Sequence, residues 1–131
     1  MSRVLALVDD LLFLSRIRES ARGTGAEVRV VRGPADLVAA ARDGARLVLV
    51  DADSSRLPWA EAVAALRSDH SLASVPVVAF LSHVHAERAE AARATGCTRV
   101  LARGAFVQEL PRLIATATRT DASSTLQENE P

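Results

Sequence analysis

Short apolar runs alternate along the chain with segments whose apolar residues recur every three or four positions. An apolar run of four or five residues is typical of a strand that a parallel sheet buries on both faces. The recurring segments have the period of amphipathic helices that cover such a sheet. The predicted strands are Val4–Val8, Val28–Val31, Leu47–Val50, Val75–Leu81 and Arg99–Ala102. The pattern therefore predicts an α/β fold, a doubly wound five-stranded parallel sheet with five helices on its two faces.

The helices are predicted from their apolar spacing and from the glycines and prolines at their ends. The first four cover residues 14–21, 34–44, 59–66 and 86–95, and an apolar stripe predicts the last one from Phe106, Leu110, Leu113 and Ala117. Pro111 is tolerated only in the first turn of a helix, so the last helix is expected to begin near Gln108. From Arg119 the chain is rich in Ser, Thr, Asp and Glu. We expect one domain over residues 1–118 and a disordered tail over residues 119–131.

Acidic residues follow two of the predicted strands directly. Asp9 and Asp10 follow the first strand, and Asp51 and Asp53 follow the third. Charges are costly inside a core strand, so these side chains should lie where the strands leave the core. In an open parallel sheet this carboxyl edge is where ligands bind. The four acids are therefore the first candidates for a functional site.

The composition narrows the classes of partner. Sixteen basic residues, all of them Arg, balance sixteen acidic ones. The arginines are interleaved with acids and lack aromatic neighbours, so we expect no binding to nucleic acid. No apolar run approaches the ~18 residues that span a bilayer, and we recognise no signal peptide. The prediction is a cytoplasmic protein with no membrane partner.

Several short motifs occur in a fixed order along residues 3–118. They are Asp9-Asp10 after the first strand, Asp51 after the third, Val75-Pro76-Val77-Val78 at the start of the fourth, Ala94-Thr95-Gly96-Cys97 before the fifth, and Leu101-x-Arg103 at its end. Together they resemble the receiver domain of bacterial two-component response regulators. The resemblance implies a flavodoxin-like fold with strand order 2-1-3-4-5.

The resemblance also implies roles for the acids. Asp51 matches the acceptor that takes a phosphoryl group from the phosphohistidine of a sensor histidine kinase. Asp9 and Asp10 match acids that hold Mg²⁺, together with Asp51 and the backbone carbonyl of Asp53. Converging carboxylates do favour a hard divalent cation with oxygen ligands.

Three positions depart from the family pattern. The Thr or Ser that ends strand four falls on Leu81, the Lys that ends strand five on Arg103, and the aromatic switch on Val100. Ser82 could replace the missing hydroxyl only if strand four ends early or bulges, because adjacent strand residues face opposite ways. Arg103 keeps the charge but has the planar fork of a guanidinium, which favours a permanent ion pair with Asp51 or Asp9.

These departures predict a stand-alone atypical receiver, or pseudo-receiver, that is not an enzyme. Phosphorylation at Asp51 is expected to be weak or lost, and the protein is expected to act by contact with a sensor kinase or another signalling protein. The contact surface, or a homodimer interface, is predicted over residues 86–95, 99–102 and 106–117, which match helix four, strand five and helix five of the family.

Other interpretations stay open at this stage. The chain could be an ordinary Mg²⁺-dependent phospho-accepting regulator, or a metal-dependent phosphohydrolase that uses Asp51 and Asp53. His83-x-His85 has a spacing that suits a metal ligand pair. Cys97, the single cysteine, is most simply a small buried apolar residue.

Overall fold

Five parallel strands form one sheet at the centre of the computed structural model, which describes residues 3–82 and 86–129, with side chains up to residue 119. The strands are β1 (Arg3–Leu7), β2 (Glu27–Val30), β3 (Leu47–Asp51), β4 (Val77–Leu81) and β5 (Arg99–Ala102). Their order is β2-β1-β3-β4-β5, and every pairing is parallel. The predicted flavodoxin-like fold class is therefore confirmed.

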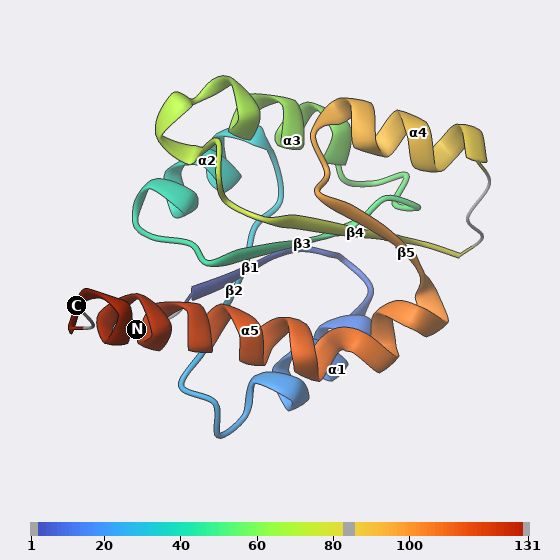
Figure 1. Ribbon diagram of the computed structural model, residues 1–131. Helices are drawn as coiled ribbons and strands as arrows, with labels where there is room; N and C mark the ends of the chain where they lie inside the picture. Colours follow the sequence, from blue (N-terminus) through green and yellow to red (C-terminus); the bar gives the residue numbers. More distant parts are fainter. Residues whose placement is uncertain (1–2, 83–85, 130–131) are drawn as a thin grey trace.

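Helices cover both faces of this sheet (Figure 1). They are α1 (Leu11–Ala21), α2 (Pro34–Arg42), α3 (Trp59–Ser68), α4 (Ala86–Thr95) and α5 (Arg103–Asn129), with a short 3₁₀ turn at His70–Leu72. Helices α1 and α5 lie on one face, and α2, α3 and α4 lie on the other (Figure 1). This arrangement brings the carboxyl ends of all five strands to one edge.

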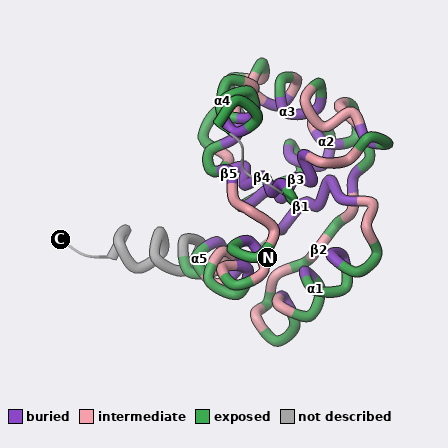
Figure 2. Tube along the Cα trace, turned by 90° about the vertical axis from the view of Figure 1, so that its right-hand side faces the viewer, coloured by how far each residue is buried: buried purple, intermediate pink, exposed green. Residues whose placement is uncertain are grey.

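The alternation of side chains along each strand divides the core into two halves. In β4, Val77, Ala79 and Leu81 belong to the half that packs against α2, α3 and α4. Val78 and Phe80 belong to the half that packs against α1 and α5. The central strands β1, β3 and β4 are almost completely buried and lie at the buried centre of the tube in Figure 2. Burial on both faces explains why the sequence shows continuous apolar runs instead of alternation.

The boundaries of the elements differ slightly from the predicted ones. β4 begins at Val77 because Pro76 has no amide hydrogen, although its carbonyl accepts a hydrogen bond from the Val48 amide at 2.9 Å. β3 extends one residue further than predicted and includes Asp51. The acid therefore ends the strand rather than following it.

The prediction that α5 begins near Gln108 is wrong. The helix begins at Arg103, directly after β5, and Pro111 lies inside it. Pro111 is exposed, whereas Phe106, Leu110 and Ile114 are buried. Burial of this stripe outweighs the missing hydrogen bond of the proline, which costs about 3 kcal/mol in a helix interior.

The backbone of α5 is helical up to Asn129, where the sequence predicts a disordered tail from Arg119. The segment contains good helix formers, including Ala122, Leu126 and Gln127, which can extend a helix that is already anchored. The domain boundary at residue 118 stays a prediction. Within the described ranges, none of the helices has the length and apolar character needed to cross a membrane.

Candidate functional site

Asp51 is the only buried charged side chain among the described residues, with 3% of its surface exposed. It ends β3 at the centre of the sheet and is in register with Phe80 of β4. Its Oδ1 accepts a hydrogen bond from the Asp53 amide at 2.9 Å, so one of the two carboxylate oxygens has a hydrogen-bond donor. The fold therefore holds this carboxylate at the carboxyl edge, with little access to water.

Burial raises the pKa of Asp51 above its ordinary value of 3.8. The hydrogen bond from the Asp53 amide and the charge of Arg103 lower it, but the desolvation of the carboxylate is the larger effect. The carboxylates of Asp53 and Asp9 raise the pKa further. The charged form of Asp51 is therefore a cost to the fold, as is common at functional sites.

Replacing Asp51 with Asn is expected to stabilise the protein at pH 7 by about 1 kcal/mol, because the variant has no buried charge and keeps the oxygen that accepts from the Asp53 amide. A raised pKa means that the native state binds the proton more tightly than the unfolded state. The advantage of the variant should therefore shrink as the pH falls through the raised pKa and vanish below 3.8. Urea unfolding at several pH values measures this. A variant that is less stable than the wild type at pH 7 would contradict it.

Asp10 and Asp9 lie beside this carboxylate at the end of β1. Asp10 is the N-cap of α1: its Oδ1 accepts from the amides of Leu12 at 2.9 Å and Phe13 at 3.3 Å. Asp9 Oδ1 accepts a long hydrogen bond from the Ser54 hydroxyl at 3.4 Å. Asp10 thus has a structural role that its match to a metal ligand did not predict, since a side chain that caps a helix satisfies an otherwise unpaired amide.

Arg103 places its guanidinium among three carboxylates. Its Nη2 lies 3.8 Å from Asp10 Oδ2 and 3.8 Å from Asp51 Oδ2, and its Nε lies 3.9 Å from Asp53 Oδ2. Of the two partners that the sequence predicted, Asp51 is found and Asp9 is not: among the described residues, the ion pairs of Arg103 are with Asp51, Asp10 and Asp53. These separations exceed hydrogen-bond distance, and the buried Nε has no hydrogen-bond partner among the described residues.

Two phenylalanine rings support the guanidinium of Arg103. Its Cζ lies 4.6 Å from the centre of the Phe13 ring and 5.8 Å from that of Phe80. A planar cation stacks well on an aromatic face, which a lysine ammonium does less effectively. The rings and the carboxylates together fix one cation at the carboxyl edge of the sheet. We call the part of this edge that carries Asp9, Asp10, Asp51 and Asp53 the acidic edge.

The arrangement does not suit Mg²⁺ while Arg103 occupies this position. Within the described ranges, no three His, Cys, Asp or Glu side chains are grouped so that they could hold a metal ion. One oxygen of Asp10 and one of Asp51 are already engaged by backbone amides. The Mg²⁺ site predicted from Asp9, Asp10, Asp51 and the Asp53 carbonyl stays a prediction and requires Arg103 to move. The hydrolase hypothesis needs the same metal.

The sequence made the carboxylate of Asp53 a candidate for a hydrolase site and its backbone carbonyl a candidate metal ligand, but it did not predict the contacts that this carboxylate forms. Its Oδ2 accepts a short hydrogen bond from the Ser82 amide, and its Oδ1 pairs with Arg88 of α4 at 3.2 Å. The Asp53 carboxylate is therefore contacted by the Ser82 amide after β4, by Arg88 of α4 and by Arg103 of α5. No local sequence signal identifies Arg88, since three further arginines occur within fifteen residues of it.

The departures from the family pattern have a structural counterpart. Leu81 is buried in the core half below α2, α3 and α4, and Val100 belongs to the same half. β4 runs in regular parallel register up to Leu81, which pairs with Ala102, so it neither ends early nor bulges. Ser82 contacts Asp53 through its amide, and its hydroxyl forms no hydrogen bond with a described residue. The role of Ser82 in phosphate sensing stays a prediction.

Cys97 does not belong to this site. Cys97 is buried, and burial raises the pKa of its thiol to about 11, with a smaller opposing effect from Arg67. A thiol with so high a pKa is protonated at neutral pH and is a poor nucleophile. His83 and His85 lie outside the described residues.

Solved structures of response regulators have the same fold. A response regulator protein from Burkholderia multivorans is 27% identical, with a TM-score of 0.71, and the match covers 88% of this chain and 94% of that one. A two-component response regulator from Legionella pneumophila is 14% identical, with a TM-score of 0.74 over 91% and 99% of the two chains. The chain has the receiver-domain fold.

A receiver domain from a sensor histidine kinase of Pseudomonas aeruginosa was solved with a magnesium ion in its active site cleft. It is 22% identical to this chain, with a TM-score of 0.71 over 89% of this chain and 97% of that one. No family model matches the sequence, and no curated protein matches it. The receiver-domain fold is thus reached by a sequence that is far from these relatives.

Proposed function

We propose that this chain is an atypical receiver domain that works by protein–protein contact, with phosphorylation of Asp51 weak or lost. The observation that carries the proposal is the position of Arg103, whose guanidinium lies within 4 Å of the carboxylates of Asp10, Asp51 and Asp53. A divalent cation and an incoming phosphoryl group would both have to compete with this fixed charge.

The groups that could bind a phosphoryl group are already occupied. In the receiver pattern, the residues that end strands four and five contact the phosphoryl oxygens. Here the Ser82 amide and Arg103, at the ends of β4 and β5, both face the carboxylate of Asp53. An internal carboxylate thus takes the place that a phosphoryl group would need.

Asp53 also connects the acidic edge to the predicted contact surface. Its carboxylate accepts a hydrogen bond from Arg88, which lies in the first turn of α4. Helix α4 has only two buried residues, Ala89 and Ala92. A helix with so small an apolar face depends on contacts of this kind for its position. The surface of α4, β5 and α5 would therefore be held in one state without phosphorylation, available to a sensor kinase, another signalling protein or a second copy of the chain.

Two exposed leucines mark a second possible contact next to the acids. Leu11 and Leu12, which follow Asp10, have 80% and 61% of their surfaces exposed. Their side chains lie outside the stripe of buried residues of α1, which includes Leu14 and Ile17. Large apolar side chains beside a polar edge favour contact with protein.

Beryllofluoride, a stable mimic of a phosphoryl group on a carboxylate, tests the proposal. In the presence of Mg²⁺ it is expected to leave the amide NMR spectrum of the wild type unchanged, because Arg103 and Asp53 occupy the site. The Asp51→Asn variant is the matched control for nonspecific effects. Shifts at residues of β4, α4 and β5 in the wild type, absent from the variant, would instead show an ordinary phospho-accepting regulator.

A further inference from the structure

A second site lies at the opposite edge of the sheet from the acids. A pocket of about 550 Å³ opens between α5 and the amino-terminal ends of β3, β4 and β5. Its volume is within the range of small-molecule sites, about 300–1,000 Å³. None of the residues discussed at the acidic edge lines it, so it is independent of the receiver site.

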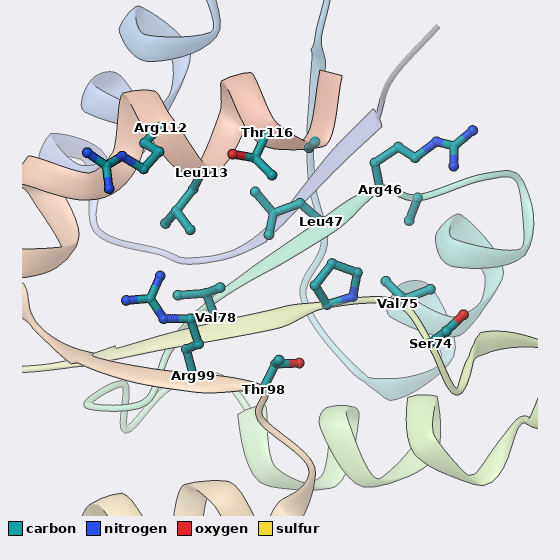
Figure 3. Close-up of a pocket in the computed structure, with 13 residues that line it drawn as sticks. Arg46, Leu47, Ser74, Val75, Val78, Thr98, Arg99, Arg112, Leu113 and Thr116 are labelled. Atoms are coloured by element: carbon teal, nitrogen blue, oxygen red, sulfur yellow. The ribbon is translucent and has the colours of Figure 1, made fainter. Parts of the chain in front are cut away.

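The interior of this pocket is apolar. Leu47 and Val78 are buried at its base, and Leu113 extends from α5 toward them (Figure 3). Val75 continues the apolar wall just before β4 (Figure 3), and Pro76 also lines the pocket. Burial of a hydrocarbon group in this space would stabilise its complex with the protein by about 25 cal/mol for each Å² of apolar surface removed from water.

The charged side chains in the described lining are all arginines, and Ser74, Thr98 and Thr116 add hydroxyl groups. Arg99 and Arg112 lie toward one end of the pocket in Figure 3, and Arg46 lies toward the other. No Asp or Glu lines the pocket within the described part of the chain. Arg99 is partly neutralised from outside by Glu109, at 2.8 Å, while Arg112 forms no ion pair with a described residue. A guanidinium at the mouth of an apolar pocket favours a planar carboxylate, which it can bind through two parallel hydrogen bonds.

We propose that this pocket binds a small organic carboxylate with an aliphatic body, the hydrocarbon lying against Leu47, Val78 and Leu113 and the carboxylate facing Arg112 and Arg99. The apolar interior would exclude a fully hydrated anion, and the arginines would disfavour a cation or a neutral lipid. The inference does not depend on whether Asp51 is phosphorylated.

Octanoate is the probe, titrated into the full chain and followed by amide NMR. We expect shifts confined to the pocket residues of β3, β4, β5 and α5, with a Kd below about 1 mM. Octanol, which lacks the charge, and acetate, which lacks the hydrocarbon, should each bind at least about tenfold more weakly. Equal binding of octanol, or no shifts with octanoate up to about 10 mM, would overturn the proposal.

Three variants assign the binding to this pocket. Arg112→Glu should weaken octanoate binding about tenfold, whereas Glu109→Gln, which frees Arg99, should strengthen it about twofold. Arg16→Glu makes the same charge reversal on the exposed side of α1 and should have no effect. Because Arg112 and Arg16 are both exposed, neither change should affect folding. Equal affinity in the Arg112 and Arg16 variants would overturn the proposal.

Discussion

Replacing Arg103 with Ala is expected to convert the acidic edge into a Mg²⁺ site. The substitution removes the guanidinium that lies within 4 Å of each of the carboxylates of Asp10, Asp51 and Asp53, and leaves three carboxylates that repel one another. A hard divalent cation with oxygen ligands relieves that repulsion. We expect Mg²⁺ affinity to rise at least about tenfold, since the charge removed lies at a distance where Coulomb energies near a protein surface reach about 4 kcal/mol.

Thermal unfolding with and without Mg²⁺ measures this change. In the variant, saturating Mg²⁺ should increase the free energy of unfolding by about 1–3 kcal/mol, because the ion binds only the native state. The wild type should show little response. Arg99→Ala is the matched control, since Arg99 forms an exposed ion pair at the other edge of the sheet. An equal gain in the wild type and the Arg103 variant would show that Arg103 does not block the metal.

Replacing Phe80 with Ala should have the largest effect on stability. Phe80 has no exposed surface, and its ring stacks between those of Phe13 at 4.7 Å and Phe106 at 4.4 Å. Its removal loses the burial of a large ring and leaves a cavity that joins β4, α1 and α5. The free energy of unfolding is expected to fall by about 3–5 kcal/mol.

Urea unfolding followed by circular dichroism measures this loss, and Phe80→Leu serves as a control that keeps most of the volume. In the Phe80→Leu control, the free energy of unfolding should fall by only about 1–1.5 kcal/mol. The same ring lies below the guanidinium of Arg103, so the Ala variant should also leave that cation less firmly placed. A loss below about 1 kcal/mol for Phe80→Ala would mean that the surrounding side chains collapse into the space.

The sequence predicts the sheet well because the central strands β1, β3 and β4 are buried almost completely on both faces. Leu47–Val50 and the run that ends at Leu81 had to be core strands, and right-handed crossovers leave few ways to order five of them. The boundaries of α5 could not be predicted in the same way. Local preference places Pro111 in a first turn, whereas the tertiary burial of Phe106 and Leu110 decides where the helix begins.

The candidate site is predictable only where it depends on position along the strands. Parallel topology brings Asp9, Asp10 and Asp51 to one edge, so their proximity follows from the order of the elements. The contacts of Asp53 and Arg88 do not follow from it, because they join side chains 35 residues apart through the loop geometry of two different elements. The N-cap role of Asp10 could have been predicted, since an Asp just before an apolar helix is a common capping signal.

Incubation with acetyl phosphate and Mg²⁺, followed by intact-mass spectrometry, tests most directly whether Asp51 has lost its phospho-accepting role. We predict that the wild type gains no phosphoryl adduct, because Arg103 and Asp53 occupy the space and the donors that the group would need. A near-complete adduct on the wild type that disappears in Asp51→Asn would contradict this account and would identify an ordinary phospho-accepting regulator.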